Sequence, residues 1–269
     1  MINPIVVGVD GSSGSLWAVE WAADEAKLRN VPLLLVHATP MLIRAGMLSA
    51  AGYERLEADR QAMLDRARAD ALRRVPGLAV EVRAVAADPG AALVAAGEHA
   101  QMLVVGARGV GGFEGLLLGS VSLFAASHAT CPIVTMPASS LARRLEHGNV
   151  VLGVDERHSS SHAIGWAFEE ADRRSAELVA MHGVNGFGAP WQEIGEQLEL
   201  AEALAGWEPK YPGLDVTRRV VPVSPARALV EMSERAALIV LGARRPSTGF
   251  GMALGRVNHT VLNHAHCPT

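Results

Sequence analysis

The chain repeats itself, and this repeat constrains the fold more than any other feature of its 269 residues. A shift of 145 places residues 6–10 (Val-Val-Gly-Val-Asp) on residues 151–155 (Val-Leu-Gly-Val-Asp) and His37 on His182. Later the shift becomes 136, which places Gly106 on Gly242 and the Cys131-Pro132 pair on Cys267-Pro268. So many identities in two constant registers indicate a tandem duplication, with nine residues deleted between about residues 40 and 80.

Apolar runs alternate with helical patterns along the first half. Continuous apolar runs at residues 5–9, 32–38, 78–86, 102–105 and 133–136 are typical of parallel strands covered on both faces. Apolar spacing predicts helices at residues 15–29, 54–75, 89–100 and 119–129, the first of them after a capped turn at residues 10–13. Residues 39–53 are expected to form a loop, and residues 191–206 form the long helix of the second half.

This alternation predicts an α/β fold with two tandem, doubly wound parallel sheets of five strands each. The first domain spans residues 1–138, a hydrophilic linker spans residues 139–149, and the second domain spans residues 150–269. The first half continues into a strand after Cys131-Pro132, whereas the second ends at Pro268-Thr269. We therefore expect the second sheet to lack its last strand, which leaves an open edge.

A glycine-rich segment follows the strand at residues 102–105. It begins at Gly106 and ends at Gly119-Ser120, where the next predicted helix starts. Glycine lets backbone amides approach a ligand closely, and the N-terminus of a helix favours an anion. The segment therefore predicts a phosphate site, although it lacks the Gly-Lys-Ser/Thr ending of the Walker loop. An ordinary flexible loop between a strand and a helix is the alternative.

The spacing Gly106-x-x-Gly109, nine residues, then Gly119-Ser120 resembles the ATP-binding pattern of the universal stress protein family. Residues 6–12 (VVGVDGS), 35–38 (LVHA) and 130–134 (TCPIV) are similar to the same family. The resemblance is to a tandem two-domain member. It implies a Rossmann-like, adenine nucleotide α-hydrolase-like sheet with strand order 3-2-1-4-5, a homodimer, and a nucleotide-binding regulatory role in the stress response.

In that strand order the chain leaves strands 1 and 4 in opposite directions, which opens a crevice at their carboxyl ends. Asp10 would bond ribose hydroxyls or hold Mg²⁺ near the phosphates; in isolation it reads equally well as a helix cap. The family pattern places phosphates at Ser120 and adenine at the main chain of Val36 and His37. The candidate ATP site thus comprises Gly8, Asp10, Val36, His37, Gly106, Ala107, Arg108, Gly109, Val110, Gly111, Gly112, Gly119, Ser120, Val121 and Ser122.

The second half departs from this pattern at two positions. Arg245 stands where the first half has Gly109, and Arg256 where it has Ser120. If the glycine position needs a positive φ, the arginine costs about 1–2 kcal/mol. One interpretation is a degenerate site, and the other is a pair of arginines that clamp phosphate. A weaker nucleotide site could persist around Gly153, Asp155, Gly242 and Gly255.

Three functions compete. The resemblance favours a regulatory ATP-binding protein, and a slow ATPase or nucleotidyl transferase is the second possibility. No general base stands beside the glycine segment, where Glu114 is the one acidic residue, so we expect no catalytic residues. An interaction scaffold with relic nucleotide sites is the third.

Composition excludes several other classes. The net charge is −4 and no long basic run occurs, which argues against nucleic acid or an anionic membrane as the main partner. Two cysteines cannot build a disulfide framework. No apolar run approaches the roughly 20 residues of a membrane span. The first strand starts at Pro4 or Ile5, which leaves no room for a signal peptide, so we expect a cytoplasmic protein.

Overall fold

The computed structural model describes residues 2–39, 50–109, 118–137, 148–155, 161–184, 186, 190–243 and 254–269. The chain divides into two compact units, Met1–Ala138 and Ser139–Thr269, and each is described by itself. No helix among the described residues is both long enough and apolar enough to cross a membrane.

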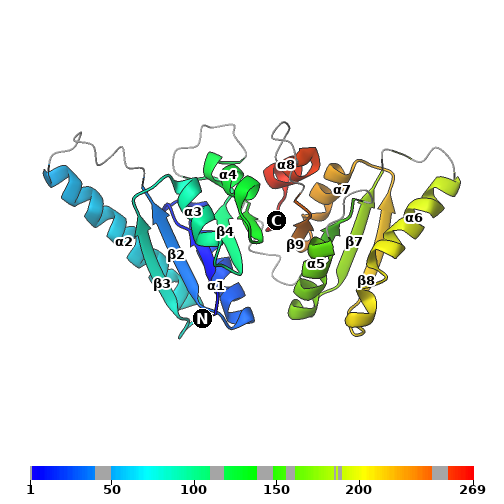
Figure 1. The fold of residues 1–269 in the computed structure, drawn as a ribbon, viewed down its shortest axis with the longest axis horizontal. Coiled ribbons are helices and arrows are strands. Elements are labelled where there is room, and N and C mark those ends of the chain that lie inside the picture. Colours follow the sequence, from blue (N-terminus) through cyan, green and yellow to red (C-terminus); the bar gives the residue numbers. More distant parts are fainter. Residues whose placement is uncertain are drawn as a thin grey trace. The chain divides into compact units, whose positions relative to one another are not determined.

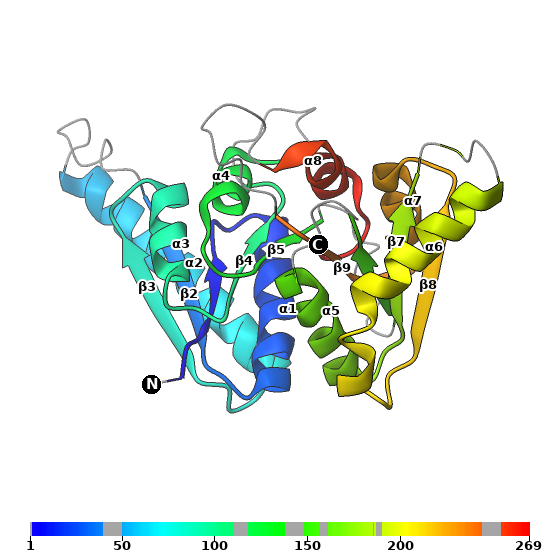
Figure 2. The same ribbon diagram turned by 45° about the vertical axis from the view of Figure 1, so that its right-hand side comes forward.

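The first unit is a five-stranded parallel sheet with the order β3-β2-β1-β4-β5, which confirms the predicted topology. Helices α1 and α2 pack together on one side of this sheet and α3 and α4 on the other (Figures 1 and 2). The elements in chain order are β1 (Ile5–Gly8), α1 (Ser13–Arg29), β2 (Leu33–Ala38), α2 (Ala50–Arg74), β3 (Val80–Val85), α3 (Pro89–Gly97), β4 (Met102–Gly106), α4 (Ser120–His128) and β5 (Ile133–Met136).

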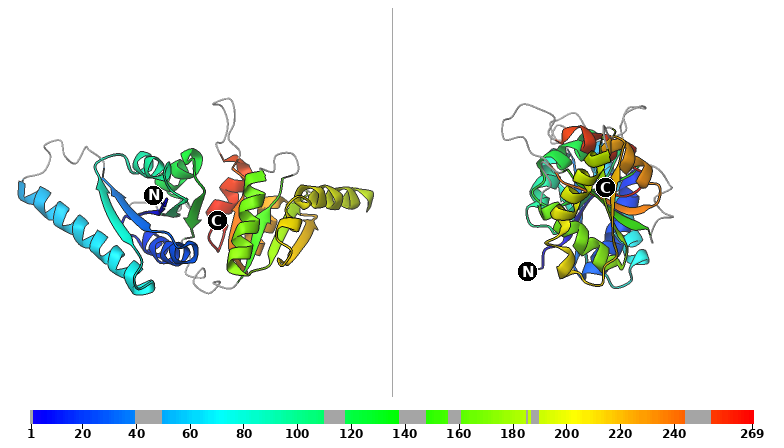
Figure 3. Two further views of the ribbon diagram at one scale, coloured as in Figure 1. Left: turned by 60° about the horizontal axis from the view of Figure 1, so that its bottom comes forward. Right: turned by 90° about the vertical axis from the view of Figure 1, so that its right-hand side faces the viewer.

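Two helix starts differ from the sequence prediction. Helix α1 begins at Ser13, two residues early, because the side chain of Ser12 caps it by accepting from the N–H of Ser15. Helix α2, the longest one described, begins at Ala50, so that Tyr53 is helical and not in a loop (Figure 3). Its first two residues are alanines, the residue with the highest helix propensity, and the helix continues through Gly52.

The core of the first unit lies on both faces of its central strands. Ile5, Leu33, Leu35, Met102 and Leu103 are fully buried, as expected for strands flanked by helices on both sides. Strands β1 and β4 lie side by side in the middle of the sheet, and Ile5 of β1 pairs with Met102 of β4.

The second unit has a four-stranded parallel sheet with the order β8-β7-β6-β9, so the prediction of a missing fifth strand is confirmed for the described residues. The N–H of Ile239 donates to the carbonyl of Pro268, as that of Leu103 does to Pro132 in the first unit. The elements are β6 (Asn149–Gly153), α5 (Ser161–Arg174), β7 (Leu178–Gly183), α6 (Pro190–Leu204), the 3₁₀ helix η3 (Glu208–Lys210), β8 (Val216–Val221), α7 (Pro225–Met232), β9 (Ala236–Leu241) and α8 (Gly255–His264).

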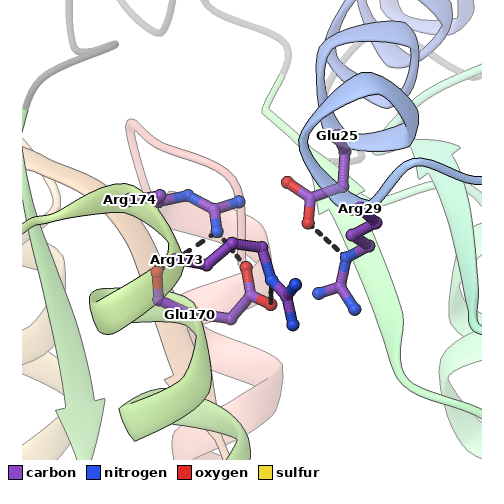
Figure 4. Close-up of polar contacts among 5 residues, drawn as sticks. All are labelled: Glu25, Arg29, Glu170, Arg173 and Arg174. Atoms are coloured by element: carbon purple, nitrogen blue, oxygen red, sulfur yellow. Dashed lines mark hydrogen bonds and ion pairs between the residues drawn. The ribbon is translucent and has the colours of Figure 1, made fainter.

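The repeat is visible in equivalent ion pairs on α1 and α5. Glu25 is buried on α1 and bonded to Arg29, one turn later (Figure 4). Glu170, the equivalent residue on α5, is buried and bonded to Arg174, with Nε of Arg173 3.7 Å from its second oxygen (Figure 4). A buried carboxylate needs such a partner, so each helix carries its own neutralising arginine.

Candidate functional site

Asp10 follows β1 at the carboxyl edge of the first sheet. Its Oδ1 accepts hydrogen bonds from the backbone N–H of Ser12, at 2.9 Å, and from the Ser12 hydroxyl, at 2.6 Å. Ser12, not Asp10, is the residue that caps α1. The Asp10 carboxylate therefore orders the turn that leads into the cap, and the Ser12 oxygen also lies 3.3 Å from the carbonyl of Arg108 beyond β4.

The carboxyl end of β4 lies against the same turn. A β-carbon on Gly106 would come within 2.7 Å of the carbonyl carbon of Gly14, and one on Gly109 would overlap Oδ2 of Asp10. Gly109 does not have a positive φ. The expectation that this position needs a left-handed backbone is therefore replaced by a steric reason: Asp10 occupies the space that a side chain would need.

The start of α4 lies next to the turn after β1 and the end of β4. Gly119 is the N-cap, its N–H donates to the carbonyl of Ala107 at 2.7 Å, and no side chain caps the helix. Ser120 is the first helical residue, so amides of the first turn lack intrahelical acceptors. The hydroxyl of buried Ser122 donates to the carbonyl of Gly106 at 2.6 Å, and thus ties α4 to the end of β4.

The end of β2 supplies the remaining residues. Val36 is buried, and its carbonyl accepts from the N–H of Val9. Nδ1 of His37 lies 2.7 Å from the carbonyl of Val9, so Nδ1 carries the proton. In the neutral ring Nε2 is then the acceptor, and the Thr39 hydroxyl lies 3.2 Å from it. Both ring nitrogens of His37 thus have partners within the protein, and these fix the orientation of the ring.

The structure thus brings the predicted residues that it describes to one edge of the first sheet. Gly8 lies at the end of β1, where a β-carbon would approach the side chain of Leu93 to 2.9 Å. Arg108 lies beside Ser12, and Val121 is in the first turn of α4. The predictions for Val110, Gly111 and Gly112 lie outside the described residues.

The equivalent edge of the second unit contains a cavity of about 370 Å³. It brings together the four residues predicted for a second site, and Gly255 has a positive φ of 71°. Arg256 opens onto the cavity, while Arg245 lies outside the described residues. The lining residues are Leu152, Gly153, Val154, Asp155, Ala163, Ile164, Met181, His182, Gly183, Pro225, Leu229, Leu241, Gly242, Leu254, Gly255, Arg256, Val257 and Asn258.

Two polar side chains of this cavity are already engaged. Nδ2 of Asn258 donates to the carbonyl of Gly242 at 2.8 Å, as Ser122 does to Gly106. Nδ1 of His182 lies 2.9 Å from the carbonyl of Val154, and its Nε2 lies 3.3 Å from Oε2 of Glu196 on α6. In the first unit the corresponding nitrogen, Nε2 of His37, faces the hydroxyl of Thr39, so the second site has a carboxylate where the first has a hydroxyl.

Comparison with known proteins shows which family the chain belongs to. The family model described as the universal stress protein family matches residues 1–137 and 146–269. Universal stress protein Rv2623 of Mycobacterium tuberculosis is 37% identical, over 98% of this chain and 94% of its own length. A universal stress protein of Mycolicibacterium smegmatis is 36% identical, over 98% and 95%. The chain belongs to the universal stress protein family.

A solved universal stress protein from Archaeoglobus fulgidus has the same fold. It aligns with 100% of this chain and 97% of its own, with a TM-score of 0.77 at 19% identity. The described part of this family member contains no group of three or more His, Cys, Asp or Glu residues that could hold a metal.

The two cysteines of this universal stress protein pack with the hydrophobic cores of their units. Burial raises the pKa of Cys131, and it raises that of Cys267 to about 12. A thiol with a raised pKa is a poor nucleophile, because the thiolate is the reactive form.

Sequence reasoning missed three residues of these sites. Ser12 and Gly14 shape the turn at the end of β1, and Asn258 replaces Ser122 in the second unit. The shift of 136 relates Ser122 to Asn258. A search for shared hydrogen-bonding ability, and not identity alone, would have found this pair.

Proposed function

We propose that the first unit binds ATP in the crevice at the carboxyl ends of β1 and β4, and that this protein is a regulatory nucleotide-binding module of the stress response. The observation that carries the proposal is the contact between Asp10 and Gly109. It joins two motifs far apart in sequence at the point where α1 and α4 leave the sheet on opposite sides. Open α/β sheets bind their ligands at such a switch point.

The residues at this crevice fit an adenine nucleotide. Asp10 would meet ribose hydroxyls or a hydrated Mg²⁺, which binds proteins through one or two carboxylates and substrate phosphates. The amides of the first turn of α4, from Ser120 onward, lack intrahelical acceptors and would receive the phosphates. Ser122 would act through its backbone, because its hydroxyl is committed to Gly106. Main-chain atoms at Val36 and His37 would border the base.

The expected affinity follows from the number of donors. One anion at a helix terminus gains about 0.3–1 kcal/mol, and up to about 2 kcal/mol when partly buried. Several such contacts, together with burial of the base, would give micromolar binding, about −8 kcal/mol. The close approach of Gly106 to Gly14, and of Gly109 to Asp10, brings the ends of β1 and β4 and the start of α1 together at one place, which supports a shared crevice there.

The cavity of the second unit favours retained, weaker nucleotide binding there. Its volume is within the range of small-molecule pockets, and it includes Asp155, the equivalent of Asp10. Arg256 replaces the serine of the first unit, so phosphates would meet a guanidinium in place of a hydroxyl.

The nucleotide content of the purified protein tests both sites. The protein is denatured, and released ATP, ADP and AMP are quantified per chain. We expect about one ATP per chain from the first unit, and calorimetric titration with ATP-Mg²⁺ should reveal a second, weaker site. Gly109→Arg should abolish the tight site, and Arg245→Gly is the matched change in the second unit. No released nucleotide and no calorimetric response would contradict the proposal and favour a scaffold.

The same experiment separates the proposal from the enzymatic alternative. Released ADP in place of ATP, with multiple-turnover phosphate release that is lost on Asp10→Ala, would indicate a slow ATPase. Intact ATP and no turnover would support regulatory binding.

A further inference from the structure

Helix α6 of the second unit has two apolar faces. Leu200 and Leu204 are fully buried on the face that packs on β7 and β8 (yellow in Figures 1 and 2). On the outer face Ile194 is 67% exposed and Leu198 is 59% exposed. These are far more exposed than Leu56 on α2, which is 38% exposed.

The outer apolar residues form a continuous stripe. Ile194, Leu198 and the half-buried Ala201 are spaced by four and then three residues, which places them above one another on one side of the helix. This is the arrangement by which an amphipathic helix contacts a second helix. Scattered exposed leucines need no explanation, but an ordered stripe on a helix that is already docked indicates an interaction surface.

The charges beside the stripe are of one sign. Helix α6 contains four glutamates and no lysine or arginine. Glu193, Glu199 and Glu202 are exposed, and no ion pair joins them to a cation within the described parts of the chain. Helix α2, the long helix of the first half, instead pairs its carboxylates internally, as between Arg60 and Glu57. Among the described residues, these three exposed glutamates of α6 therefore have no cationic partner.

We propose that this surface, the acidic apolar stripe of α6, is a docking site for a basic amphipathic helix of another protein. Apolar residues of that helix would cover Ile194 and Leu198, and its flanking lysines or arginines would face Glu199 and Glu202. A second copy of α6 would bring glutamates against glutamates, and an anionic membrane would repel them, so charge selects a cationic partner. The proposal is independent of nucleotide binding, because none of the stripe residues lines the cavity.

The test uses the full chain and a defined probe. The probe is a fluorescent 18-residue helical peptide (a length of about 27 Å) with leucines at the same spacing and lysines beside them. A second peptide carries glutamate in place of every lysine. Fluorescence anisotropy should show the lysine peptide binding at least tenfold more tightly than the glutamate peptide, with a difference that shrinks as salt rises.

Variants then locate the site. Ile194→Ser with Leu198→Ser should weaken the lysine peptide at least tenfold, and Glu199→Gln with Glu202→Gln should reduce the salt dependence. Leu56→Ser on α2 is the control and should change neither. Circular dichroism checks that all variants fold, as expected for exposed positions.

Three results would overturn the proposal. One is equal binding of the two peptides, and another is binding that Ile194→Ser and Leu198→Ser leave unchanged. The third is evidence that something else covers the stripe. If light scattering shows a dimer of the unmodified protein and a monomer of the Ile194→Ser, Leu198→Ser variant, the stripe contacts a second copy of this chain. Flotation with anionic phosphatidylglycerol vesicles that is lost in the same variant would assign it to a membrane.

Discussion

Gly109→Ala is the most informative change in the first unit. The new methyl group would occupy the position of Oδ2 of Asp10, so the carboxylate must turn away. That movement breaks the two hydrogen bonds that Oδ1 accepts from Ser12, at 2.9 and 2.6 Å. Because these hydrogen bonds are only partly buried, we expect their loss to cost about 1–3 kcal/mol of free energy for the two together.

If bound ATP needs the Asp10 carboxylate in its present position, the same free energy should be lost from ATP binding. About 1–3 kcal/mol corresponds to a dissociation constant raised roughly 5- to 140-fold. Calorimetric titration with ATP-Mg²⁺ measures it. Gly77→Ala is the control, since Gly77 has a φ of 84° and open space around it, so that alanine there strains the turn without touching the crevice.

A double-mutant cycle gives the stricter test. In an Asp10→Ala background the clash is absent, so Gly109→Ala should have little further effect on ATP binding. Strictly additive losses would refute the argument that Asp10 and Gly109 act as a pair. Unchanged affinity in the single Gly109→Ala variant would show that the carboxylate position is irrelevant to the nucleotide.

Three further predictions concern stability. Gly106→Ala should lower the free energy of unfolding in urea by about 1–3 kcal/mol or more, because its β-carbon meets the backbone of Gly14, which cannot rotate away. Ser122→Ala should cost about 1–2 kcal/mol in the same assay, because the Gly106 carbonyl loses its donor; a loss as small as that of an exposed serine would contradict this. Cys267 has a pKa of about 12 when folded, above the value of about 8.5 for a free thiol, so the folded state retains the proton longer. Stability from this group is complete below about pH 8.5 and is lost as pH rises toward 12, and Cys267→Ala should remove that decline from urea unfolding curves.

The repeat and the apolar runs were sufficient to predict two parallel sheets and the missing strand of the second one, because buried parallel strands have a strong sequence signal. The strand order, in contrast, was implied by the resemblance to the universal stress protein family. The start of α2 was not predicted, since the residues before Glu54, which include Gly52, show no apolar periodicity. The edge that holds Asp10 and Gly106 also followed from the topology.

Side-chain directions could not be predicted in the same way. The sequence places Asp10 after a strand, but its contact with Ser12 and its position over Gly109 depend on how close β1, β4 and α1 come together. The cavity of the second unit was hidden for a similar reason. Residues such as Leu229 and Met181 have the pattern of core residues, and only the packing reveals that they also border a pocket.

The overlap between the Asp10 carboxylate and any side chain at position 109 has an evolutionary consequence. The two positions form one mutational unit, because neither can change freely while the other keeps its role. The second copy has the aspartate as Asp155 and carries Arg245 at the sequence position that corresponds to Gly109. The coupling between positions 10 and 109 in the first unit therefore has no counterpart of the same residues in the second, whereas the buried strands of both units keep the same apolar pattern.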